Sequence, residues 1–171
     1  MAKSYCLTRA LIAPLPFGAM LLSGAALAEP SLQSQLVGAW TYVSVDTVRP
    51  DGSRSPMYGS APNGVAIFDG NGHYALVTIR SDLPRFASGN RMDGTPDEYK
   101  SIAQGSISHF GRYTVNEADK TITFYIEAST FPNWNGLEQK RPLSINGDEL
   151  KWVTATASGG GSGEVVLKRA R

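Results

Sequence analysis

Cysteine, histidine and net charge are all scarce in this sequence, and each scarcity excludes a class of protein. The 171 residues contain one cysteine and two histidines, and 16 basic against 15 acidic side chains give a formal charge of +1. One cysteine excludes an internal disulfide framework and any metal or redox site built from a Cys-x-x-Cys pair. Two histidines are too few for a three-histidine metal site, and a charge near zero gives no electrostatic reason to expect nucleic acid. We therefore expect no metal, no cofactor and no nucleic-acid partner.

The first 28 residues have the pattern of a secretory signal peptide. Lys3 and Arg9 form a basic start, and residues 10–22 are almost wholly apolar. The tripeptide Ala-Leu-Ala at residues 26–28 is the small-x-small pattern that signal peptidase cleaves. Two prolines interrupt the apolar run, which argues against a membrane anchor because a spanning helix needs about 20 consecutive apolar residues. We expect cleavage of residues 1–28, no integral membrane anchor, and a periplasmic or secreted protein.

Cleavage changes the composition of the chain that folds. It removes the one cysteine, Cys6, together with two basic residues and no acidic ones. Residues 29–171 then carry 14 basic and 15 acidic side chains, a formal charge of −1, and no cysteine. At this length a single domain is the expectation, and its fold cannot depend on the redox state of a thiol.

Residues 29–171 have the pattern of an all-β protein. Short segments rich in Val, Ile, Thr, Tyr and Phe alternate polar with apolar positions and are separated by Gly, Pro, Asn and Asp. Two pairs of segments flank the turn sequences Asp-Gly-Asn-Gly and Asn-Gly-Asp, which favour hairpins. The expected strands are residues 39–48, 54–58, 63–68, 73–80, 106–115, 121–128, 139–145, 149–156 and 164–169.

One short helix is expected between these strands, with a helical turn before the first of them at residues 31–37. Thr95-Pro96-Asp97-Glu98 is a capping box with proline at the first helical position, so a helix runs from there to about Gln104 and stops at Gly105. Eight to nine hairpin-linked strands with one short inserted helix predict an antiparallel up-and-down barrel. A closed barrel of about eight strands leaves room for one small ligand.

Alternation also predicts which residues of the first strand share a face. Trp40, Tyr42 and Ser44 fall on one face, and Val43 and Val45 on the other.

Five short motifs occur in order along the chain. They are Leu36-Val37-Gly38-Ala39-Trp40, Phe68-Asp69-Gly70-Asn71-Gly72-His73, Phe110-Gly111-Arg112-Tyr113, Phe131-Pro132-Asn133-Trp134 and Leu143-Ser144-Ile145-Asn146-Gly147-Asp148-Glu149-Leu150. This ordered set resembles the bacterial and fungal lipocalin-like domain family, over about residues 31–170. The resemblance implies a lipocalin-type barrel. In lipocalins the Trp of a Gly-x-Trp motif closes the barrel base near a basic residue of the last strand, which implies a base built from Gly38, Trp40 and either Lys168 or Arg169.

Three charged residues on three strands of the second half are candidates for a site. If Arg112, Glu127 and Arg141 point into the barrel they must pair, because an isolated buried charge costs several kcal/mol. Such a pair would bind an anionic head group or hold a carboxylate for proton transfer. The alternative is an ion pair at the rim or surface, worth about 0–1 kcal/mol.

Three further residues belong to the candidate ligand site. Tyr125 shares a face with Glu127 and is either an acid beside a carboxylate or a packed side chain with its hydroxyl satisfied. Trp134 lies in a loop with Phe131 and is either a lid over a ligand or a plug at the barrel end. His109 is alone in its strand, and a position in the barrel wall is favoured over catalysis.

These residues support three hypotheses about function. The first is an exported barrel that binds a small, mostly hydrophobic molecule. The second is a cofactor-independent isomerase, cyclase or hydratase, which requires Tyr125, Glu127 and Arg141 to converge on one pocket. The third is a filled barrel with a structural or interaction role. Fold class by itself does not decide between them.

Overall fold

The computed structural model describes Met1 and residues 30–171, so the expected signal peptide lies outside the described residues. Residues 30–171 form nine strands, two α-helices and one 3-10 helix. In chain order they are α1 (Leu32–Leu36), β1 (Gly38–Val48), β2 (Arg54–Pro56), β3 (Asn63–Phe68), β4 (His73–Ile79), α2 (Pro96–Gly105), β5 (Ser106–Asn116), β6 (Thr121–Ser129), η1 (Pro132–Trp134), β7 (Glu138–Asn146), β8 (Glu149–Thr154) and β9 (Ser162–Arg169).

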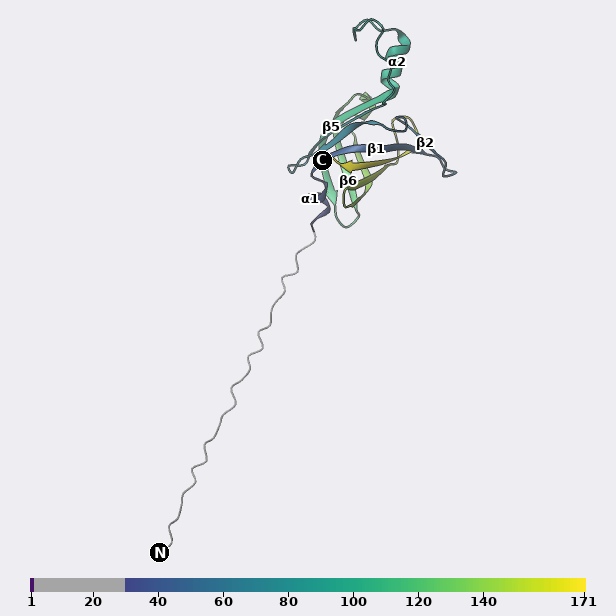
Figure 1. Ribbon diagram of the computed structural model, residues 1–171. Coiled ribbons are helices and arrows are strands. Elements are labelled where there is room, and N and C mark those ends of the chain that lie inside the picture. Colours follow the sequence, from purple (N-terminus) through teal and green to yellow (C-terminus); the bar gives the residue numbers. More distant parts are fainter. Residues whose placement is uncertain (2–29) are drawn as a thin grey trace.

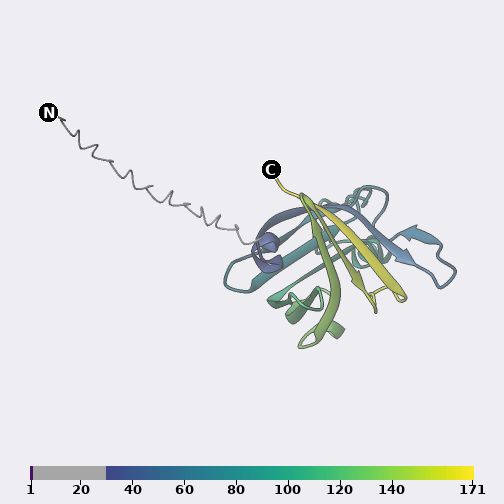
Figure 2. The same cartoon turned by 90° about the horizontal axis from the view of Figure 1, so that it is seen from below.

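The strands close into an eight-stranded antiparallel barrel with one extra strand. From β3 to β9 each strand pairs with its neighbours in sequence, and β1 pairs with both β3 and β9. The extra strand β2 pairs only with the C-terminal end of β1, at Asp46 to Val48. Figure 2 shows α1 at one end of the barrel and the β1–β2 hairpin projecting at the other. The predicted up-and-down barrel with one short inserted helix is confirmed.

Local sequence signals account for the turns and for α2. In the β3–β4 turn the Asp69 carboxylate accepts hydrogen bonds from the backbone N–H groups of Asn71 and His73. At α2 the capping box is complete, since Thr95 and Glu98 each accept from the other's backbone N–H. Helix α2 stands off from the barrel at the end opposite α1 (Figure 1). No helix in the described part of the chain is long and apolar enough to cross a membrane.

The predicted alternation in β1 is right as far as Tyr42 and wrong beyond it. The pairing of β1 with β9 shifts register between Tyr42 and Ser44, which makes Val43 a bulge residue, and this residue is 50% exposed. A bulge sets two residues opposite one and so reverses the faces that follow. Val45 therefore turns inward and is buried.

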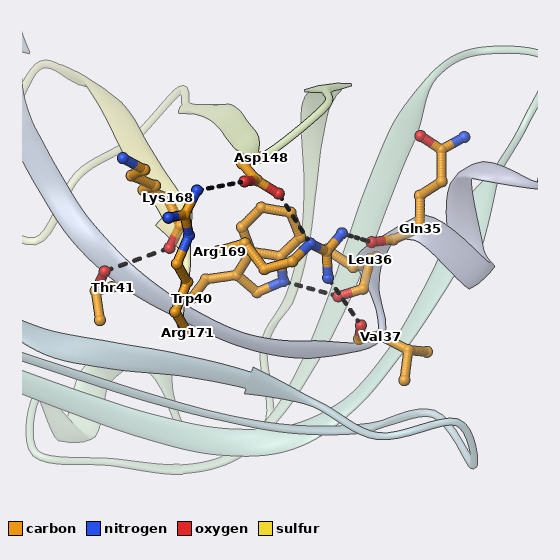
Figure 3. A network of polar contacts seen from close by, with 9 residues as sticks. All are labelled: Gln35, Leu36, Val37, Trp40, Thr41, Asp148, Lys168, Arg169 and Arg171. Carbon is orange, nitrogen blue, oxygen red and sulfur yellow. Dashed lines mark hydrogen bonds and ion pairs between the residues drawn. The ribbon is translucent and has the colours of Figure 1, made fainter.

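Trp40 closes the base of the barrel. Its side chain is fully buried, and its Nε1–H donates to the backbone oxygen of Leu36 at 2.8 Å. The guanidinium carbon of Arg169 lies 4.1 Å from the centre of the indole ring, and Arg169 also donates to the backbone oxygen of Gln35 at 2.7 Å (Figure 3). Lys168 is exposed. The basic partner of Trp40 is thus Arg169. Both side chains donate hydrogen bonds to backbone oxygens of α1, which holds this helix across the end of the barrel.

Gly38 is required by this arrangement. Its φ of +131° is one that other residues rarely adopt, and an added Cβ would lie 3.3 Å from Nη1 of Arg169. Any side chain at Gly38 would therefore be strained and would push against the Arg169 guanidinium.

Aromatic side chains fill the interior next to this base. Phe68 lies at the centre of the cluster, with its ring 5.2 Å from that of Tyr113, 6.2 Å from that of Phe124 and 6.3 Å from that of Trp152. All four side chains are buried. The free space of the interior therefore lies in the other half, toward the loops that carry α2 and η1.

Candidate functional site

A narrow cavity, here called the slot, occupies that other half of the barrel. Its volume is about 50 Å³. The lining residues come from six of the eight barrel strands and from loops at the mouth: Tyr42, Val45, Met57, Tyr58, Leu76, Thr78, Ile107, His109, Trp134, Arg141, Trp152, Thr154, Ala157, Ser158, Gly163 and Val165.

His109 on β5 is a buried, uncharged wall residue of the slot. Its Nδ1 lies 2.9 Å from the hydroxyl of Tyr74, and its ring packs edge-on against those of Trp134 and Phe124. Burial, and then the nearby positive charge of Arg141, lower the pKa of His109 from 6.5 to about 3. The imidazole is therefore neutral near pH 7 and adds no charge to the slot.

Arg141 on β7 brings a positive charge into the slot. Only 3% of the residue is exposed. Its Nη2 donates to Oε1 of Gln139 at 2.5 Å, and its guanidinium carbon lies 4.6 Å from the centre of the Phe124 ring. Burial lowers the pKa of Arg141 to about 10, so the side chain remains charged near pH 7. None of the ion pairs within residues 30–171 includes Arg141.

The other polar groups around Arg141 are neutral. Burial raises the pKa of Tyr42 to about 12 and also raises the pKa of Tyr74. Both phenols therefore keep their protons near pH 7. Among the lining residues, Arg141 is the sole Lys, Arg, Asp or Glu, which gives the slot a net positive charge.

The structure separates the predicted site residues into two groups. His109, Trp134 and Arg141 line the slot. Arg112, Tyr125 and Glu127 are exposed, so they lie on the outer face of the wall and cannot line the interior.

The alternation of inward and outward side chains along β5 and β6 explains why these three residues lie outside. On β6 the inward side chains are Ile122, Phe124 and Ile126, so the residues between them face outward. On β5 the buried residues His109, Gly111 and Tyr113 alternate with exposed ones, so Arg112 faces outward, where it pairs with Tyr125. Sequence alternation left the side of Arg112 open, because the inward face of β5 carries a histidine and a glycine whereas Phe110 faces outward.

The convergence required for the enzyme hypothesis does not occur. Arg141 lies inside the barrel, whereas Tyr125 and Glu127 lie on its outer face. Of the two alternatives for Glu127, a pair with an arginine inside the barrel does not occur, and no ion pair within residues 30–171 includes the buried Arg141.

Trp134 is part of the slot wall. The residue is 9% exposed, and its ring packs edge-on against both His109 and Phe131. The segment that carries it is tied to β6, since the N–H of Gly136 donates to Ile126 and the N–H of Ser129 donates to the Asn135 side chain.

Sequence reasoning missed several polar residues of the slot. Thr78 alternates with exposed residues along β4, and Trp152 and Thr154 do so along β8. The same alternation that identified the strands could have placed these side chains inside. Alternation also marks Tyr42, which shares the face of Trp40 and precedes the bulge at Val43.

Comparison with known proteins agrees with this architecture. The sequence model of the lipocalin-like domain matches residues 37–170, which is most of the chain. The chain belongs to the lipocalin-like domain family. The resemblance expected from the five motifs is thereby confirmed, and the slot is the interior cavity of a lipocalin-like barrel.

A curated relative of this lipocalin-like chain is described as a carrier. The 4'-hydroxy-3'-methoxypropiophenone carrier protein ppsC of Aspergillus oryzae (strain ATCC 42149 / RIB 40) is 28% identical over 82 residues, which cover 44% of this chain and 74% of the relative.

Two solved structures are also similar to the chain. A lipocalin-like protein from Bacteroides uniformis ATCC 8492 has 11% identity and a TM-score of 0.45, covering 79% of this chain and 98% of its own. A redesigned β-barrel has 18% identity and a TM-score of 0.42, covering 81% and 95%. Neither similarity bears on the ligand.

Proposed function

We propose that this lipocalin-like barrel binds a small, mostly apolar molecule in the slot. The observation that carries the proposal is the slot itself, a cavity lined mainly by aromatic and aliphatic side chains with a few polar groups among them. Small-molecule sites have this composition, because apolar walls supply affinity and a few polar groups fix orientation. The description of the Aspergillus relative as a carrier of a small aromatic ketone also supports binding of a small molecule.

A matched pair of substitutions tests binding in the slot. Val165 faces the slot and Val153, on the paired strand β8, faces outward with 38% exposed. Val165→Phe fills part of the slot and is expected to weaken binding of the uncharged dye N-phenyl-1-naphthylamine by about tenfold or more. Val153→Phe adds the same atoms outside and is expected to leave binding unchanged. The measurement is a fluorescence titration of the dye.

Two results would count against binding in the slot. The dye could fail to bind the wild-type protein at all, or both phenylalanine variants could bind it as the wild type does. In the second case the dye occupies the outer surface of the barrel. Near-ultraviolet circular dichroism of each variant establishes that it is folded before its titration is interpreted.

We further propose that the chain is exported and works in the periplasm or outside the cell. The support is the pattern of residues 1–28, with its basic start, apolar run and Ala-Leu-Ala cleavage sequence. An exported carrier would meet its ligand outside the cytoplasm.

Export predicts a specific processed chain. Expression of the full sequence in a Gram-negative host is expected to yield a periplasmic protein whose intact mass corresponds to a chain beginning at Glu29. That chain has no thiol, because Cys6 is removed. Ala28→Lys should block cleavage, since signal peptidase requires a small residue there. Recovery of the uncleaved wild-type chain in the cytoplasm would contradict the proposal.

A further inference from the structure

No carboxylate of residues 30–171 forms an ion pair with the buried Arg141. Arg141 contacts the faces of Phe124 and Trp134 and donates one hydrogen bond to Gln139, but no ion pair within residues 30–171 includes it. Its Nε is buried and has no hydrogen-bond partner among the described residues. An unpaired buried charge is costly to the fold, so its presence here calls for a partner from outside the chain.

A second unpaired donor lies beside it. The indole Nε1 of Trp152 is also buried and without a hydrogen-bond partner in the described part of the chain. Trp152 pairs with Leu143 across the β7–β8 ladder, which makes it a diagonal neighbour of Arg141, two residues before Leu143 on the same face. Both side chains line the slot. The slot therefore holds two neighbouring N–H donors, one of them charged, that need acceptors.

We propose that the ligand is an organic carboxylate whose carboxylate group lies between Arg141 and Trp152, a proposal that rests on the slot being a ligand site. A carboxylate has two acceptor oxygens and a planar shape that matches a guanidinium. Its apolar body would lie along the aromatic walls toward the mouth. His109 and the tyrosines are neutral, so no negative side chain in the lining repels the anion.

Cinnamate and cinnamamide form a matched pair of probes, since both are flat and of similar size but only the first is charged. We expect the wild-type protein to bind cinnamate about ten- to a hundredfold more tightly than cinnamamide, because hydrogen bonds to charged groups are the stronger ones. Isothermal titration calorimetry measures both affinities. Equal affinities, or tighter binding of the amide, would overturn the carboxylate assignment while leaving the slot a ligand site.

Substitution of the arginine separates its charge from the shape of the slot. Arg141→Met keeps much of the side-chain volume and is expected to bring the ratio of the two affinities close to one, with cinnamamide binding retained. The free variant should be at least as stable as the wild type, because apolar replacements of buried charges are often neutral or stabilising. Arg112→Met, on the outer face, is the control and should keep the wild-type ratio. An unchanged ratio in Arg141→Met would also overturn the assignment.

A failure of the proposed function gives a different result. If cinnamate, cinnamamide and N-phenyl-1-naphthylamine all fail to bind the wild-type protein, the slot is not a ligand site and the present inference falls with it. If the dye and the amide bind but cinnamate is not preferred, only the carboxylate is wrong. The wild-type comparison alone distinguishes these outcomes, whether or not Arg141→Met folds.

Discussion

Replacement of Trp40 by alanine is expected to lower the free energy of unfolding by about 4 kcal/mol. The indole is fully buried, and it joins the first strand of the barrel to α1 through its hydrogen bond to Leu36 and to the last strand through Arg169. Alanine leaves a large cavity at the base, where the surrounding strands cannot collapse because the barrel is closed. Urea denaturation followed by far-ultraviolet circular dichroism measures the loss.

Trp40→Phe separates the two contributions of the indole. Phenylalanine keeps an aromatic ring beneath the Arg169 guanidinium but cannot donate to the backbone oxygen of Leu36, so a loss of roughly half that of alanine is expected. A loss below about 1 kcal/mol for Trp40→Ala would show that the base does not depend on this side chain. Because the slot lies in the opposite half of the barrel, dye binding to the folded variants should change little.

Acid is expected to destabilise the barrel through His109. Its pKa is about 3 in the folded protein against 6.5 for an unperturbed histidine, so between these values the unfolded chain binds a proton that the folded one does not. Stability is therefore full above about pH 6.5 and falls as the pH drops toward 3. Between about pH 7 and pH 5 the expected loss is about 2 kcal/mol.

The histidine contribution can be isolated by substitution. His109→Gln keeps a polar side chain that can bond the Tyr74 hydroxyl but has no group that titrates, so the loss between pH 7 and pH 5 should largely disappear. His73→Gln, on an exposed residue beside Asp69, should retain the wild-type loss because His109 is untouched. Urea denaturation at each pH gives the profiles. A wild-type profile that is flat over this range would contradict a buried, neutral His109.

Much of the fold was predictable from short stretches of sequence. The Asp-Gly-Asn-Gly turn and the capping box at Thr95 carry their own hydrogen-bonding partners, so a few neighbouring residues decide the local structure. The Gly-x-Trp motif marked the base, but it left Lys168 and Arg169 as equal candidates. Only the register of β9 against β1 shows that Arg169 stacks on Trp40 while Lys168 faces outward.

The site was predictable in part. His109, Trp134 and Arg141 were identified as candidates and do line the slot, but Arg112, Tyr125 and Glu127 lie on the outer wall. Charged residues of neighbouring strands look alike in sequence, because a strand buries every second residue and its distant pairing partners decide which of its two faces points inward.

The sequence by itself determined that this chain forms an antiparallel barrel, because hairpin turns and alternating strands are specified by residues close together in the chain. Tertiary structure alone decided that Arg141 lies buried without a carboxylate. That outcome depends on which residues of β6 and β7 face inward and on closure between β1 and β9, which joins residues far apart in sequence. The scarcity of charge noted at the outset therefore has a counterpart inside the barrel, where a single unpaired guanidinium sets the electrostatics of the slot.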